Sequence, residues 1–173
     1  MMFLTNDECR TWCAQYHQPI PDDGTANRMG NMRFDLAVSA ANCYALSARL
    51  SESIGPRQTA LLWVTADNIW PSSTNLHLYY KLRQAYGDRR LLARAPGHLF
   101  LDYEMPDLVS FIQVALLSGW DAHLFGDLGY GKLFVSHDSW VEVWRASKAE
   151  LDLVATTLQQ LKSVKVSDSP QAS

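Results

Sequence analysis

The second half of the chain contains three short strand candidates in a row, and this feature restricts the possible folds more than any other. The candidates span 120–125, 132–136 and 140–145, and they are joined by a Gly-rich turn and by a short connection at 137–139. Connections this short join antiparallel neighbours, because a parallel crossover needs about a dozen residues or more. We therefore predict a three-stranded antiparallel meander, followed by a helix that begins after Ser147.

Capping signals and apolar spacing predict the other elements. Thr5 with Glu8, and Ser147 with Glu150, form capping boxes that mark the first turns of helices. Ala-rich or apolar runs of helical spacing indicate further helices, and Pro96–Gly97 is typical of a turn between two strands. The remaining elements are helices from Asn6 and at 36–50, 74–86 and 108–117, a buried strand at 60–65, a hairpin of 91–95 with 98–103, and a loop at 18–31.

This order of helices and strands is typical of an α+β layer architecture. We expect one domain over 1–166, with a five- to six-stranded, largely antiparallel sheet, helices packed on it, and the meander and its helix at the C-terminal end. The polar segment 167–173 is expected to be a disordered tail. With 47% apolar residues, 173 residues suffice for one hydrophobic core and are few for two domains.

Charge, hydropathy and cysteine content argue against several classes of protein. A net charge of -3 provides no positive field for a phosphate backbone, so nucleic acid is not expected as a partner. No apolar run reaches the roughly 20 residues that span a bilayer, and no basic segment of a signal peptide precedes Asp7. Cys9 and Cys13 lie one helical turn apart among three cysteines, which favours buried, reduced thiols in the cytoplasm.

The residues that could carry chemistry complete no catalytic or metal motif. Ser136, His137 and Asp138 have the identities of a hydrolytic triad, but neighbouring strand residues point to opposite faces. Asp121 and His123 share one strand face, which His137 or Asp138 could approach, yet no H-x-x-x-H or C-x-x-C spacing accompanies them. The Gly-rich turn joins two strands rather than a strand and a helix, unlike a phosphate loop. We therefore expect neither a metal nor a cofactor.

The six tryptophans are the least ordinary feature of the composition, and two of them belong to the last strand. Trp140, Glu142 and Trp144 alternate along one face of it. The length of the loop before this strand determines which residues lie beside the tryptophans, because a shift of one residue in register inverts the two faces of a strand. With a two-residue loop, Leu133 and Val135 lie on the Trp side. With a three-residue loop, the core face holds Leu124, Leu133, Val135, Val141 and Val143. The opposite face then gathers Asp121, His123, Phe134, Ser136, Trp140, Glu142 and Trp144.

Aromatic side chains among a few polar groups are typical of protein interfaces and ligand grooves, so this face is the leading candidate site. Its predicted binding residues are Phe134, Trp140, Glu142 and Trp144, joined by Trp70 from a loop. The alternative interpretation is that the C-terminal helix covers the face, which would make both tryptophans part of the core.

Three functions follow from these patterns. The first is a non-catalytic protein-interaction module of adaptor, inhibitor or immunity type, which binds an unknown protein partner through the aromatic face. Two clusters of opposite charge support it, with five basic residues between Lys81 and Arg94 and acidic residues at 102–107. The basic cluster is also typical of a solvated helix end. The second is a small hydrolase or metal-assisted enzyme that uses Asp121, His123 and Glu142. The third is a self-assembling unit that buries an aromatic face in a homodimer.

Overall fold

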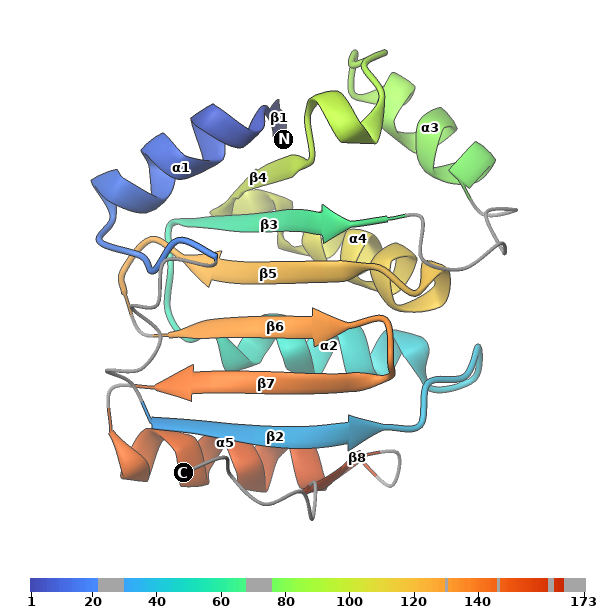
Figure 1. Cartoon of the computed structure of the whole chain (residues 1–173). Helices are drawn as coiled ribbons and strands as arrows, with labels where there is room; N and C mark the ends of the chain where they lie inside the picture. The colour runs from blue at the N-terminus through green and yellow to red at the C-terminus, as the bar shows by residue number, and fades with distance from the viewer. Residues whose placement is uncertain (22–29, 68–75, 130, 146, 162–163, 167–173) are drawn as a thin grey trace.

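All strands in the described part of the chain belong to one sheet, and the architecture is α+β (Figure 1). The computed structural model describes residues 1–21, 30–67, 76–129, 131–145, 147–161 and 164–166. Within these ranges, eight antiparallel strands lie in the order β1-β4-β3-β5-β6-β7-β2-β8, together with five α-helices. The strands are β1 (Met2–Leu4), β2 (Gly30–Leu36), β3 (Thr59–Ala66), β4 (Gly97–Leu101), β5 (Asp121–Gly126), β6 (Lys132–Ser136), β7 (Trp140–Arg145) and β8 (Val164–Val166). The helices are α1 (Asn6–Gln15), α2 (Cys43–Ser53), α3 (Leu76–Ala85), α4 (Met105–Ser118) and α5 (Lys148–Gln159).

Helices α2, α4 and α5 cover one face of the sheet, which lies at the back in Figure 1. Strand alternation points Leu62, Leu124 and Val141 to this face, where they are at most 1% exposed. Helix α4 is apolar nearly all round, and its Phe111 and Ile112 are buried in the same core. Because burial of each such side chain stabilises the fold by about 1.5–3 kcal/mol, this layer holds most of the hydrophobic driving force.

Helix α1 packs on the opposite face, over β4, β3 and β5. Its Trp12 and its two cysteines form a second apolar cluster with Leu61, Trp63, Leu99 and Phe125. The close approach of α1 to the sheet depends on Gly97, because a Cβ at this position would overlap Sγ of Cys9. Helix α1 therefore covers only one half of this face. No helix of the described ranges lies over the other half, formed by β6, β7 and β2 (Figure 1).

The predicted meander is confirmed: β5, β6 and β7 pair as consecutive antiparallel strands, and α5 follows them. Both capping boxes are also present. Thr5 Oγ1 accepts a hydrogen bond from the Glu8 N–H, and Ser147 Oγ accepts one from the Glu150 N–H, each at 3.3 Å. Helix α4 ends at Gly119, which has the left-handed φ of 62°. Among the helices that the structure describes, none combines the length and hydropathy of a membrane span.

The sheet has eight strands rather than the five or six expected. Strands β1 and β8 have three residues each, which is too short to show a period. Strand β2 begins at the end of the loop predicted at 18–31 and continues to the start of the helix predicted at 36–50; residues 22–29 lie outside the described residues. Its signal is present in the sequence, because Met32, Phe34 and Leu36 alternate with polar residues. The predicted tail at 167–173 also lies outside the described residues.

The helix predicted at 36–50 is wrong at its start, because Leu36 ends β2. The side chain of Asn42 then organises a turn: its Nδ2 donates to the Ala37 carbonyl (2.6 Å), and its Oδ1 accepts from the Ser39 N–H (2.8 Å). Helix α2 begins only at Cys43. The helix propensity of the Ala-rich run is therefore overridden by the pairing of β2 and by this side-chain turn.

The hairpin predicted at 91–103 is also wrong. Its first segment forms a 3-10 turn at Leu92–Arg94, whereas its second segment forms β4. Strand β4 pairs with β1, as in Phe3 with His98, and with β3, as in Leu61 with Leu99. Long-range pairing therefore replaces the expected local pairing across Pro96–Gly97.

The basic segment at 81–94 is not solvated throughout, because Arg83 is 0% exposed. Its Nη1 donates to Tyr79 Oη at 2.6 Å, its Nε lies 3.4 Å from Asp88 Oδ1, and its Cζ lies 4.3 Å from the centre of the Phe3 ring. Tyr79 Oη is also 2.9 Å from Nε2 of buried His98. A buried cation needs such partners, so Arg83 belongs to the core and is not available to an acidic partner.

Candidate functional site

The strand register places the predicted aromatic residues on one face of the meander. Ser136 pairs with Trp140, which leaves a three-residue loop at 137–139, with Ser139 at a left-handed φ of 61°. Phe134 is therefore opposite Glu142 on β7 and opposite His123 on β5. The alternate residues Leu124, Leu133, Val135, Val141 and Val143 all lie in the main core.

Helix α5 does not cover this face. Its apolar residues Leu151, Val154 and Leu158 pack in the main core on the other side of the sheet. Strand β2 lies beside β7 and adds three exposed residues that the sequence interpretation missed, Asn31, Arg33 and Asp35. We call this surface the open half-face, because no helix of the described ranges lies on it; Lys132, Ser136 and Trp144 within it are nevertheless buried. It consists of Asn31, Arg33, Asp35, Lys132, Phe134, Ser136, Trp140, Glu142 and Trp144.

Aromatic rings form a row that runs from β5 onto the open half-face. The ring of His123 lies 4.7 Å from that of Phe134, which lies 5.2 Å from that of Trp140. Arg33 extends this row, because its Cζ lies 3.9 Å from the centre of the Trp140 ring. Phe134 and Trp140 are half-buried, so parts of both rings remain available to a partner.

Trp144 differs from Trp140, because it is only 8% exposed. The Nζ of Lys132 lies 4.7 Å from the centre of its ring, and Lys132 itself is buried. Trp144 therefore offers little surface for contact. Trp70, the fifth predicted binding residue, lies outside the described residues.

The three residues of the enzyme hypothesis each have a different environment. Asp121 Oδ1 lies 2.8 Å from Nδ1 of His137, and this hydrogen bond raises the pKa of His137. Glu142 accepts a hydrogen bond from the Asn31 side chain. The contacts that the structure describes therefore do not join Asp121, His123 and Glu142 into an acid–base group.

His123 is set among aromatic rings and is almost fully buried. Burial, with the nearby charge of Lys132, lowers its pKa to about 3, so the imidazole is neutral at physiological pH. Its Nδ1 has no hydrogen-bond partner among the described residues. In the same ranges, no three His, Cys, Asp or Glu side chains lie close enough to hold a metal ion.

The comparisons with known proteins assign no family to this chain. No family model matches it, and no curated protein or solved structure is significantly similar to it. The fold and the geometry of the open half-face therefore carry the functional inference.

Proposed function

We propose that this chain is a non-catalytic protein-interaction module that binds a protein partner through the open half-face. A single observation carries the proposal. The rings of Phe134 and Trp140, with the guanidinium of Arg33 over the Trp140 ring, lie on a part of the sheet that no helix of the described residues covers. Tryptophan, tyrosine and arginine are the side chains most enriched at binding hot spots.

The rigidity of the open half-face supports this function. Its rings and Arg33 stand on three adjacent strands, β6, β7 and β2, whose opposite side is packed against α2 and α5, so their positions are set before a partner arrives. Binding then costs little ordering of side chains, which is the advantage of a preorganised surface. The partner should place an apolar or aromatic side chain on Trp140 and a hydrogen-bond acceptor against Arg33.

Site-specific photo-crosslinking tests the proposal. A photoreactive phenylalanine analogue at position 33 should capture a partner in cells, whereas the same analogue at position 44 should not, because exposed Tyr44 lies on α2 behind the sheet. The partner is then purified and its affinity for the chain measured. Trp140→Ala should weaken binding by about tenfold or more, the loss typical of a hot-spot residue.

The stability of the variants must be followed with the binding. Trp140→Ala should change the melting temperature little, whereas Trp144→Ala should lower it, because Trp144 is buried against Lys132. Equal capture from positions 33 and 44, or equal affinity of Trp140→Ala and the wild type, would refute the proposal. Sedimentation of the purified chain separates a foreign partner from a second copy: a dimer dispersed by Trp140→Ala would identify the partner as the chain itself.

A further inference from the structure

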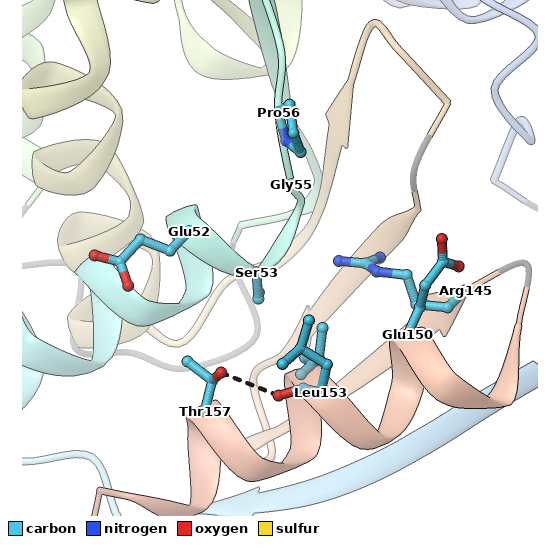
Figure 2. A pocket seen from close by; sticks show the side chains of 9 residues that line it. Glu52, Ser53, Gly55, Pro56, Arg145, Glu150, Leu153 and Thr157 are labelled. Carbon is cyan, nitrogen blue, oxygen red and sulfur yellow. Dashed lines mark hydrogen bonds between the residues drawn. The ribbon is translucent and has the colours of Figure 1, made fainter.

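A cavity of about 360 Å³ lies on the helical side of the sheet, between the end of α2, the connection to β3 and the first turns of α5 (Figure 2). Its walls are mainly apolar and include Pro56, Leu153, Val154 and the side chain of Thr157. The hydroxyl of Thr157 donates to the Leu153 carbonyl at 3.0 Å and is thus engaged within α5. The volume falls within the range of small-molecule sites, about 300–1,000 Å³.

One buried cation projects into this cavity. Arg145 ends β7 on the face opposite to Trp144, and its guanidinium points into the space between α2 and α5 (Figure 2). The residue is 3% exposed. Its Nη1 donates to the Trp144 carbonyl at 2.8 Å, whereas its Nη2 is buried and has no acceptor among the described residues. A buried donor of a charged group without an acceptor is costly, and such groups are rare in folded proteins.

The neighbouring strand leaves room for this guanidinium. Gly131 lies just before β6, and a Cβ at this position would overlap Nη1 of Arg145. Burial lowers the pKa of Arg145, but an arginine side chain stays protonated at neutral pH. The cavity therefore contains a permanent positive charge with an unused donor.

The two carboxylates that line the cavity form no ion pair with Arg145 among the described residues, although the negative charge of Glu150 acts on it from a longer distance. Glu150 accepts a hydrogen bond from the Ser147 N–H at 3.2 Å, as part of the capping box of α5. Glu52 pairs with Arg49 at 2.8 Å, and Figure 2 shows its carboxylate pointing away from Arg145. Both carboxylates are therefore engaged with other partners, and in the part of the chain that the structure describes Nη2 of Arg145 keeps no acceptor.

We propose that this cavity binds a small organic acid, with a single carboxylate at the guanidinium of Arg145 and a compact apolar body against Pro56, Leu153 and Val154. A carboxylate is the anion that suits one guanidinium, through a charge-assisted hydrogen bond. The apolar walls provide the remaining binding energy. A phosphate or a dicarboxylate fits less well, because its second charge would meet the apolar walls and the nearby Glu150 and Glu52 without a second cation.

Pairs of isosteric acids and amides test this site on the wild-type protein. Octanoate and benzoate are titrated by calorimetry and compared with octanamide and benzamide, which retain the apolar body but carry no charge. At least one acid should bind about tenfold or more tightly than its amide, because the amide lacks the charge-assisted hydrogen bond. Inorganic phosphate serves as the anion without an apolar body and should bind more weakly than the acids. Equal affinity of both acids and their amides would overturn the proposal.

Variants then locate the site. Arg145→Met retains the length and apolar stem of the side chain and should abolish the preference for the acid, whereas Arg89→Met, which removes an exposed arginine, should leave it unchanged. Where Arg145→Met fails to fold, nuclear magnetic resonance of the wild type decides: octanoate must shift the amide signals of Leu153 and Val154. Shifts confined to other residues would overturn the proposal. Trp140→Ala should bind the acid normally, which separates this site from the open half-face.

Discussion

Two buried histidines should make the stability of this fold fall steeply on mild acidification. His98 is 0% exposed, and its ring nitrogens lie near Tyr79 Oη and the Leu62 carbonyl. Burial lowers its pKa to about 3, as it does for His123 on β5. Both imidazoles are therefore neutral in the folded state throughout the range from pH 7 to pH 5.

The magnitude follows from proton linkage. In the unfolded chain both histidines return to a pKa of 6.5, so between pH 7 and pH 5 only the unfolded state takes up protons. This uptake lowers the free energy of unfolding by about 1.9 kcal/mol for each histidine, or about 4 kcal/mol for both. The total stability of a domain is only about 5–15 kcal/mol, so the loss is a large share.

His137 acts in the opposite direction, whereas the carboxylates with lowered pKa values, such as Asp88, act mainly at lower pH. The pKa of His137 is raised by the hydrogen bond with Asp121, so His137 stabilises the fold below its unfolded pKa and loses that effect as the pH rises through its folded pKa. It therefore offsets part of the loss on acidification. Against the effect of burial, hydrogen bonds from Arg90 lower the pKa of Asp88 to about 2, and its contribution disappears only below about pH 4.

Urea denaturation at pH 7, 6 and 5 measures the effect. The variant His123→Phe retains an aromatic ring beside Phe134 and removes one titrating group, so its stability should fall by about 1.9 kcal/mol less than that of the wild type. The variant His77→Phe changes an exposed histidine and should show the full wild-type loss. A wild-type stability that is unchanged between pH 7 and pH 5, or equal losses in His123→Phe and wild type, would refute the reasoning.

Three further predictions concern the packing of the core. Tyr79→Phe should cost about 2–4 kcal/mol in chemical denaturation, because it leaves two buried donors or acceptors unpaired, whereas Tyr103→Phe at an exposed position should cost almost nothing. Gly97→Ala should cost about 1–3 kcal/mol because α1 must move, whereas Gly126→Ala should be tolerated, since its nearest contact would be an ordinary 3.5 Å. Burial raises the pKa of Cys9 to about 12, and all three thiols are buried, so they should react with a thiol reagent only after unfolding; rapid reaction of the folded protein would contradict this.

The open half-face shows which features of the candidate site could be predicted from the sequence. The residues on the aromatic side of the meander could be predicted once the loop at 137–139 was taken as three residues long, because alternation then assigns every side chain. Whether that side is covered depends on where the helices pack, and no local pattern determines this. The contribution of Arg33 depends on β2, which reaches β7 across more than a hundred residues of chain. The unpaired Nη2 of Arg145 likewise has no sequence signal, because in the sequence Arg145 is simply a polar residue at the end of a strand.

The sequence by itself determined the features whose partners lie within a few residues: the capping box of Thr5 with Glu8, the helix end at Gly119, and the antiparallel pairing of neighbouring strands in the meander. In each case the hydrogen bonds or backbone angles are satisfied locally, so the residue types carry the information. The tertiary structure alone decided the insertion of β2 between β7 and β8, the pairing of β4 with β1 and β3, and the burial of Arg83. These depend on contacts between distant segments, where the burial of apolar surface outweighs local propensity.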